Sequence, residues 1–129
     1  MNDQAHAEEI LEAARRDLRA LRAMNDPEAF SDEIFGFHAQ QSVEKALKAW
    51  LAFLEQRFPK THDLKQLIDL LGEGGVLTAG MDDFVDLNAF AVQYRYESLY
   101  SVFLNPSRIA AQERINVMSG ALWHARDLR

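Results

Sequence analysis

Apolar residues return every three or four positions along most of this chain, and this helical spacing is the feature that most restricts its fold. No segment alternates apolar and polar residues convincingly at the period of two that a half-buried β-strand requires. We therefore predict an all-α protein. Because 129 residues suffice for one hydrophobic core but not for two, we assign residues 1–129 to a single helical domain.

Prolines and glycines divide the periodic pattern into four long helices and one short helix. In chain order, we expect these helices over about Asp3–Ala23, Pro27–Gln56, His62–Leu71, Met81–Ser101 and Pro106–Leu128. Thr61 is the expected N-cap of the short helix, and Asn105 is that of the last helix. Short connections favour antiparallel neighbours, so the predicted architecture is an up-and-down bundle of four long antiparallel helices plus a short additional helix.

Composition excludes several classes of protein. The chain has no cysteine, which rules out disulfides, thiolate zinc sites and cysteine nucleophiles. The histidines are too scattered for a local zinc motif, so we expect no metal and no cofactor. A net charge of -6 argues against sequence-independent binding to long nucleic acid, although a local basic patch is compatible with it. Neither a membrane span nor a secretory signal is visible, and we expect a cytoplasmic protein.

The second predicted helix carries two opposed faces. Its apolar arc is the predicted core face and consists of Gly36, Ala39, Val43, Ala46, Leu47, Trp50 and Leu54. The opposite stripe consists of Ile34, His38, Gln41, Lys45, Lys48 and Glu55, flanked by Phe37 and Glu44. Because large apolar residues begin this stripe, it is either covered by another helix, a second subunit or a ligand, or else solvated with Glu44 and Lys48 paired along the helix.

Two arginines fall within apolar arcs of the later helices. Arg95 projects between the apolar arcs of the fourth predicted helix. Arg114 lies within the apolar arc of the last helix, which consists of Ala110, Ala111, Val117, Met118, Ala121 and Ala125. A guanidinium held among apolar side chains requires an anion, because an unpaired charge there costs several kcal/mol. The candidate anions are Glu44, Asp63 and a bound phosphate, which arginine grips with two hydrogen bonds. A structural ion pair that joins two helices is the other reading.

Three ordered segments carry a family resemblance: "AQQSVEKALKAWL" at 39–51, "PKTHDLKQLIDLL" at 59–71 and "YRYE" at 94–97. Together they resemble the HEPN domain family over nearly the whole chain. The residues that carry the resemblance are Gln41, Glu44, Lys45, Leu47, Lys48, Thr61, His62, Asp63, Leu64, Arg95 and Tyr96. The resemblance implies a helical bundle that dimerises and is often encoded beside a small nucleotidyltransferase. Such a domain serves as the binding partner of that enzyme or as one member of a toxin–antitoxin pair.

Many HEPN proteins are ribonucleases, whose signature places a histidine shortly after an arginine in the later helices. Here Arg95 is followed by "YESLY", without a histidine at the required distance, and the next histidine is His124. Arg57 and His62 do enclose a suitable interval, "FPKT", but that interval lies in the loop before the short helix and includes a proline. We therefore predict no catalytic residue.

The leading hypothesis is a HEPN-like module that binds a nucleotide, an RNA end or a partner nucleotidyltransferase and lacks ribonuclease activity. It is expected to form a homodimer without membrane contact. The predicted ligand-binding residues are Gln41, Lys45, Lys48, His62 and Arg95, supported by Glu44, Asp63, Tyr96 and Arg114. One alternative is a ribonuclease toxin that uses Arg95, Tyr100 or His62. The other is a purely structural dimer or antitoxin in which Arg95 and Glu44 satisfy each other.

Overall fold

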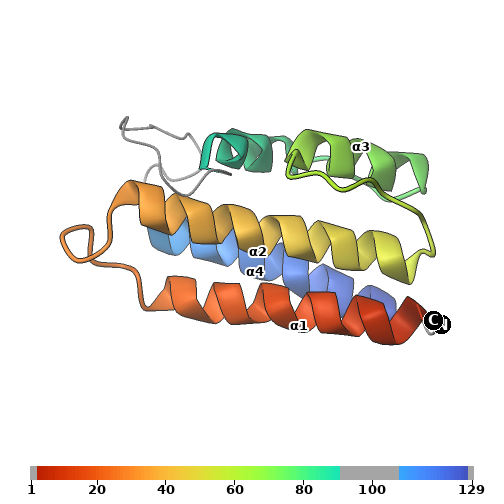
Figure 1. Cartoon of the computed structure of the whole chain (residues 1–129), viewed down its shortest axis with the longest axis horizontal. Coiled ribbons are helices and arrows are strands. Elements are labelled where there is room, and N and C mark those ends of the chain that lie inside the picture. Colours follow the sequence, from red (N-terminus) through yellow and green to blue (C-terminus); the bar gives the residue numbers. More distant parts are fainter. Residues whose placement is uncertain (1–2, 91–107, 128–129) are drawn as a thin grey trace.

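The fold is built from helices, as the periodicity predicts. The computed structural model describes residues 3–90 and 108–127 (Figure 1). Its elements are α1 (Asp3–Arg22), α2 (Asp32–Phe53), α3 (Leu64–Glu73), the 3-10 helix η1 (Asp82–Phe90) and α4 (Arg108–Asp127). Within these ranges there is no strand, and the prediction of an all-α helical bundle is confirmed. None of the described helices is long and apolar enough to cross a membrane.

Helix α2 is the centre of the arrangement. It runs antiparallel to α1, and α3 and η1 lie along its other side, while α4 passes behind α1 and α2 in Figure 1. Its predicted core face is confirmed: Gly36, Ala39, Val43, Ala46 and Leu47 are buried, and Trp50 and Leu54 are partly buried against the core. All other described helices therefore take their positions from contacts with α2.

Two helix starts differ from the predicted ones because capping side chains decide them. Helix α2 begins at Asp32 and not near Pro27, since the Ser31 hydroxyl accepts a hydrogen bond from the backbone N–H of Ile34 at 3.3 Å. The N-cap of α3 is Asp63, whose carboxylate accepts from the backbone N–H of Lys65 at 3.0 Å. The prediction of Thr61 as this N-cap is wrong. Asn88 of η1 favours the observed start, because its side chain bonds both Leu64 N–H and the Asp63 carboxylate.

The segment predicted as an α-helix over Met81–Ser101 begins as a 3-10 helix. Its described part, Asp82–Phe90, buries Phe84, Leu87 and Phe90, which are spaced strictly by three residues. A 3-10 helix aligns residues at that spacing on one face, whereas an α-helix would rotate them apart. Residues 91–101 of the predicted helix lie outside the described residues, as does the predicted cap at Asn105 and Pro106.

Helix α4 turns a different face to the core from the one predicted. Over residues 108–118, where side-chain burial is described, the buried residues are Arg108, Ala111, Gln112, Ile115 and Met118. Val117, which the apolar pattern placed in the core, is 70% exposed, and Arg114 is partly exposed. Ala111 and Met118 of the predicted arc are buried as expected, but the core face also includes Arg108, Gln112 and Ile115, which the predicted arc left out.

Arg108 and Gln112 of α4 donate hydrogen bonds to carbonyl groups at the end of α1 and in the turn after it. The last carbonyl groups of a helix lack partners within the helix and need donors from elsewhere. Gln112 donates to the Leu21 carbonyl at 2.8 Å, and Arg108 donates to the Met24 carbonyl at 2.7 Å. Arg108 also pairs with Asp32 at 2.9 Å and lies over the Phe35 ring. One guanidinium thus joins the end of α1, the start of α2 and the start of α4.

The contact between Gly36 and Phe90 gives a test of the packing of α2 against η1. A Cβ atom on Gly36 would overlap the Phe90 ring. We expect Gly36→Ala to lower the free energy of unfolding by about 1–3 kcal/mol, because the ring must move within a packed core. The matched control is Gly72→Ala in α3, where the nearest atom to the new Cβ is Thr78 Oγ1 at 3.9 Å. This variant should gain about 0.5–1 kcal/mol from the higher helix propensity of alanine. Urea denaturation measures both, and equal stability of the two variants would contradict the packing argument.

Candidate functional site

The polar stripe of α2 lies near the protein surface, between α1 and the segment that precedes α3. Phe37, His38, Gln41, Lys45 and Lys48 are all half-buried, whereas Ile34 and Glu55 at its two ends are exposed. The stripe is therefore neither fully covered nor fully solvated. Its long polar side chains are held by partners on both sides, which are Asp17 of α1 and His62 before α3.

Glu44 is the buried centre of this stripe, and its side chain is 5% exposed. One carboxylate oxygen accepts hydrogen bonds from Gln40 Nε2 and from His62 Nδ1, both at 2.9 Å. The other oxygen accepts from Lys48 Nζ at 3.0 Å. Burial acts to raise the pKa of Glu44, but the hydrogen bonds from Gln40, His62 and Lys48 outweigh it, so that the pKa is lowered overall. The carboxylate is consequently ionised at neutral pH.

His62 presents its imidazole to solvent while one ring nitrogen is fixed. Because an ionised carboxylate only accepts hydrogen bonds, Nδ1 of His62 carries the proton that faces Glu44. The His62 side chain is 71% exposed, and Nε2 has no partner among the residues that the structure describes. Gln40 also donates to the backbone carbonyl of His62 at 3.2 Å, which holds this segment against α2. The ring is therefore oriented by the protein and accessible from outside.

A second charged group lies along the same stripe, on the side of α1. Lys45 Nζ pairs with an oxygen of Asp17 at 2.7 Å. Nδ1 of His38 lies 3.7 Å from the other Asp17 oxygen, which is too long for a hydrogen bond, and this buried nitrogen has no hydrogen-bond partner within residues 3–90 and 108–127. Gln41 donates to Gln40 at 2.7 Å and so connects the stripe to the Glu44 centre.

The structure brings together some of the predicted site residues and separates others. Gln41, Glu44, Lys45, Lys48 and His62 share the α2 stripe. Asp63, by contrast, serves as the cap of α3, with Asn88 as its side-chain partner. Arg95 and Tyr96 lie outside the described residues.

Arg114 lies apart from the α2 stripe. Its anion is Asp83 of η1, at 2.5 Å, and not Glu44 or Asp63 as expected from the sequence. The guanidinium also lies over the Phe84 ring. The expectation that it needs an anion was correct, but its position follows from the rotated face of α4, which brings it to η1.

Sequence reasoning missed Gln40, Asp17 and Arg108. Gln40, Glu44 and Lys48 follow one another at intervals of four, and this spacing was a usable signal for a hydrogen-bonded row on a helix. Nothing local indicates that Asp17 meets Lys45, because this contact depends on how α1 packs on α2. Arg108 belongs to the arc of Ala111 and Ile115, so its burial could have been anticipated only with the correct face of α4.

The arrangement is suited to holding an oxyanion next to an oriented imidazole. Each lysine ammonium carries three N–H donors and uses one for a carboxylate among the described residues. Further donors can therefore reach a ligand oxygen without breaking the internal pairs. No group of three or more potential metal ligands occurs among the described residues.

Comparison with known proteins agrees with the resemblance inferred from the sequence. A family model described as the HEPN domain matches residues 7–122. Searches of curated proteins and of solved structures found no match. The matched range includes α1, α2, α3 and η1 whole or nearly so, together with most of α4, and the family prediction is confirmed.

The lowered pKa of Glu44 predicts how stability depends on pH. The unfolded chain binds a proton at Glu44 at a higher pH than the folded chain does, so stability falls as the pH drops from near 4.5, the ordinary value for this group, through the lowered folded pKa. In Glu44→Gln this contribution is absent, and the variant should lose less stability between about pH 5 and pH 3, although it starts less stable by roughly 1–3 kcal/mol.

Urea denaturation across this pH range measures the effect. Glu73→Gln, at an exposed position of α3, is the matched control and should follow the wild-type curve. Parallel curves for the wild type and Glu44→Gln would contradict the assignment of Glu44 as a buried ionised centre.

Proposed function

Because this chain belongs to the HEPN domain family, we propose that it is a binding module for a nucleotide or an RNA end. It acts with a nucleotidyltransferase, as one homodimeric domain over residues 1–129, in the cytoplasm and without ribonuclease activity. The observation that carries this proposal is the α2 stripe, where Lys45 and Lys48 lie on one half-buried face and the exposed, oriented His62 contacts Glu44 from the segment before α3. The ligand contacts that we assign are Gln41, Lys45, Lys48, His62 and Arg95.

The chemistry of the stripe favours a compact anion. The ammonium groups of Lys45 and Lys48 supply charged donors for phosphate oxygens, and the half-buried setting strengthens such bonds relative to those in open water. The amide of Gln41 can both donate and accept, as recognition of a base edge requires. His62 adds a polar group whose orientation is already fixed by Glu44, so little entropy is lost when it contacts a ligand.

The charges around the stripe also limit what it binds. Asp17 and Glu44 neutralise the two lysines, and the whole chain carries a net charge of -6. Long nucleic acids are attracted by dense basic surfaces that displace many counterions, and this stripe offers few charges for that purpose. A mononucleotide or the end of an RNA strand needs only a few well-placed donors, and it is therefore the ligand class that we propose.

The His62–Glu44 pair favours one second candidate, a ribonuclease. A carboxylate that binds Nδ1 of a histidine orients the ring with Nε2 turned away from it, an arrangement that is common in general bases. Cleavage of RNA would place this Nε2 near a ribose 2′-OH. The sequence lacks the family's arginine–histidine spacing after Arg95, and for this reason we rank the nuclease below the binding module.

One test of this proposal measures nucleotide binding. Isothermal titration with a panel of mono- and triphosphate nucleotides should identify a ligand, and Lys48→Ala should weaken its binding by roughly 10-fold or more, the loss expected for a charge-assisted hydrogen bond. Lys45→Ala/Arg95→Ala should weaken it further. Lys65→Ala is the matched control, because Lys65 pairs with Asp69 on the exposed side of α3. Failure of all nucleotides to bind, or equal affinities of the Lys48→Ala and Lys65→Ala variants, would favour a purely structural role.

Another test distinguishes a non-catalytic binding module from a ribonuclease. Purified protein incubated with single-stranded RNA without added metal should leave the RNA intact, as judged by denaturing gel electrophoresis. His62→Ala is run in parallel. RNA cleavage by the wild type that disappears in His62→Ala would establish the nuclease and end the non-catalytic proposal.

A further inference from the structure

Gln40 fixes the direction of the hydrogen bonds beneath the α2 stripe. Its side chain is fully buried. Its amide nitrogen Nε2 donates to the Glu44 carboxylate at 2.9 Å and to the backbone carbonyl of His62 at 3.2 Å. Both partners only accept hydrogen bonds, so the opposite orientation of the amide would place its oxygen against two other oxygens and leave all of them without donors. The amide of Gln40 therefore has one allowed orientation.

This orientation determines what Gln41 offers to a ligand. The amide oxygen of Gln40 accepts from Nε2 of Gln41 at 2.7 Å, so the amide nitrogen of Gln41 is turned inward. The carbonyl oxygen Oε1 of this half-buried side chain has no partner within residues 3–90 and 108–127. Gln41 thus keeps a fixed hydrogen-bond acceptor, with one N–H beside it, for a ligand.

His62 is oriented in the same sense from the other side of Glu44. The carboxylate accepts from Nδ1 of His62 at 2.9 Å, so in the neutral ring the lone pair lies on Nε2. This nitrogen belongs to a side chain that is 71% exposed, and it lacks a partner in the described part of the chain. Gln41 Oε1 and His62 Nε2 are therefore two acceptors that are held in place by the same buried pair, Gln40 and Glu44.

The two fixed acceptors lie beside the two lysines of the stripe. Gln41 and Lys45 are four residues apart on α2, a spacing that makes side chains neighbours on a helix. His62 and Lys48 bind the two oxygens of one carboxylate, that of Glu44. Each lysine also keeps N–H donors beyond its internal pair. The stripe thus combines charged donors with neutral acceptors over a short distance.

We propose that this combination selects a ribonucleotide, whose phosphate oxygens bind Lys45 and Lys48 and whose ribose hydroxyl groups donate to Gln41 Oε1 and His62 Nε2. The inference rests on the proposed function and specifies its ligand. Ribose hydroxyls are the donors nearest to the phosphate in a nucleotide, whereas the amino groups of the bases lie farther away. A deoxynucleotide lacks one of these hydroxyls and leaves a fixed acceptor without its donor, so it is bound less tightly.

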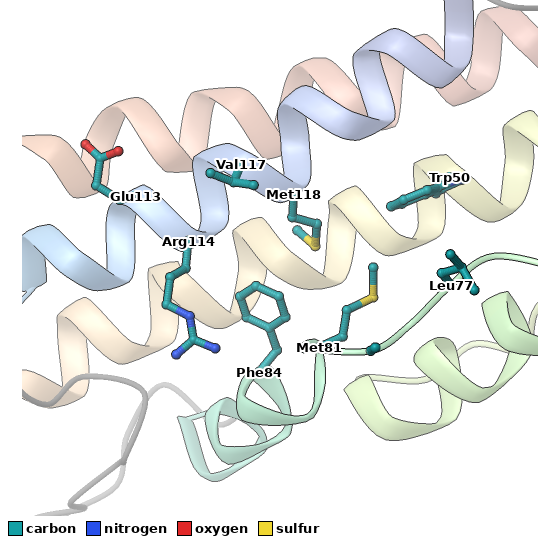
Figure 2. A pocket seen from close by; sticks show the side chains of 10 residues that line it. Trp50, Leu77, Met81, Phe84, Glu113, Arg114, Val117 and Met118 are labelled. Atoms are coloured by element: carbon teal, nitrogen blue, oxygen red, sulfur yellow. The ribbon is translucent and has the colours of Figure 1, made fainter.

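The apolar groove between α4 and η1 does not offer this combination. Its volume is about 410 Å³, and Figure 2 shows Met81 and Phe84 pointing toward Met118 of α4. Arg114, the basic residue of its lining, already pairs with Asp83. A phosphate and two hydroxyls would meet a mainly apolar surface there, and we therefore place the ribonucleotide on the α2 stripe.

Ligands that differ only in one hydroxyl group test the proposal. Isothermal titration is carried out with the ribonucleotide that binds best and with its 2′-deoxy and 3′-deoxy forms. We expect each deoxy form to bind about 3- to 10-fold more weakly, the loss of one uncharged hydrogen bond. The 2′-O-methyl and 3′-O-methyl forms, which keep the oxygen but lack the donor, should not recover this affinity.

Removal of the acceptors from the protein identifies the partner of each hydroxyl. In Gln41→Ala and in His62→Ala, the preference for the ribonucleotide over one of its deoxy forms should disappear, because the acceptor for that hydroxyl is gone. Gln66→Ala is the matched control, since Gln66 is an exposed glutamine of α3 outside the stripe. It should keep the preference of the wild type.

A measurement without ligand tests the orientation of the histidine alone. The ¹⁵N chemical shifts of the ring nitrogens distinguish the two neutral tautomers from each other and from the protonated ring, and the His62 signals are those lost in His62→Ala. Once the ring is neutral, we expect its proton on Nδ1. A proton on Nε2 would overturn the assignment of this nitrogen as an acceptor, and with it the proposal.

The remaining outcomes separate this inference from the function on which it rests. If no nucleotide binds, the proposed function fails and the ribonucleotide assignment fails with it, even if the proton is on Nδ1. If nucleotides bind but the deoxy forms bind equally well, or if both alanine variants keep the preference, the selection of ribose hydroxyls is wrong and the binding module stands.

Discussion

The structure around α2 depends on one buried carboxylate. An ionised Glu44 is stable within the protein only because donors approach both of its oxygens, and these donors come from its own helix and from the segment before α3. Gln40 donates both to Glu44 and to the backbone carbonyl of His62, and so links the carboxylate to the segment before α3. The hydrogen bonds that satisfy this single side chain therefore help to hold the segment before α3 against α2.

Much of the fold could be predicted because it follows from local periodicity. The all-α class, the apolar arc of α2 and the approximate positions of the described α-helices depend on repeats that are visible in the sequence. The 3-10 form of η1 and the rotated face of α4 could not be read in this way. Both are decided by distant partners: Phe90 fits against Gly36, while Arg108 and Gln112 turn inward to reach carbonyl groups of α1 and the turn after it.

The candidate site was predicted in part for the same reason. The row of polar residues on α2 is a property of one helix, so Gln41, Lys45, Lys48 and Glu44 could be grouped without coordinates. Asp17 belongs to α1, and its contact with Lys45 depends on how α1 packs on α2, whereas Gln40 lies on α2 itself and was missed despite its spacing of four from Glu44.

The capping of α1 by α4 has a consequence for the order of folding. Arg108 lies 84 residues beyond Met24, and Gln112 lies 91 residues beyond Leu21. While the chain emerges from the ribosome, α1 and α2 are complete long before these donors exist, so the Leu21 carbonyl then relies on its local bond from the Met24 N–H, and water takes the place of Arg108 and Gln112. Synthesis of α4 thus supplies the last side-chain hydrogen bonds at this end of the α1–α2 pair, and a nascent chain that stalls before α4 lacks them.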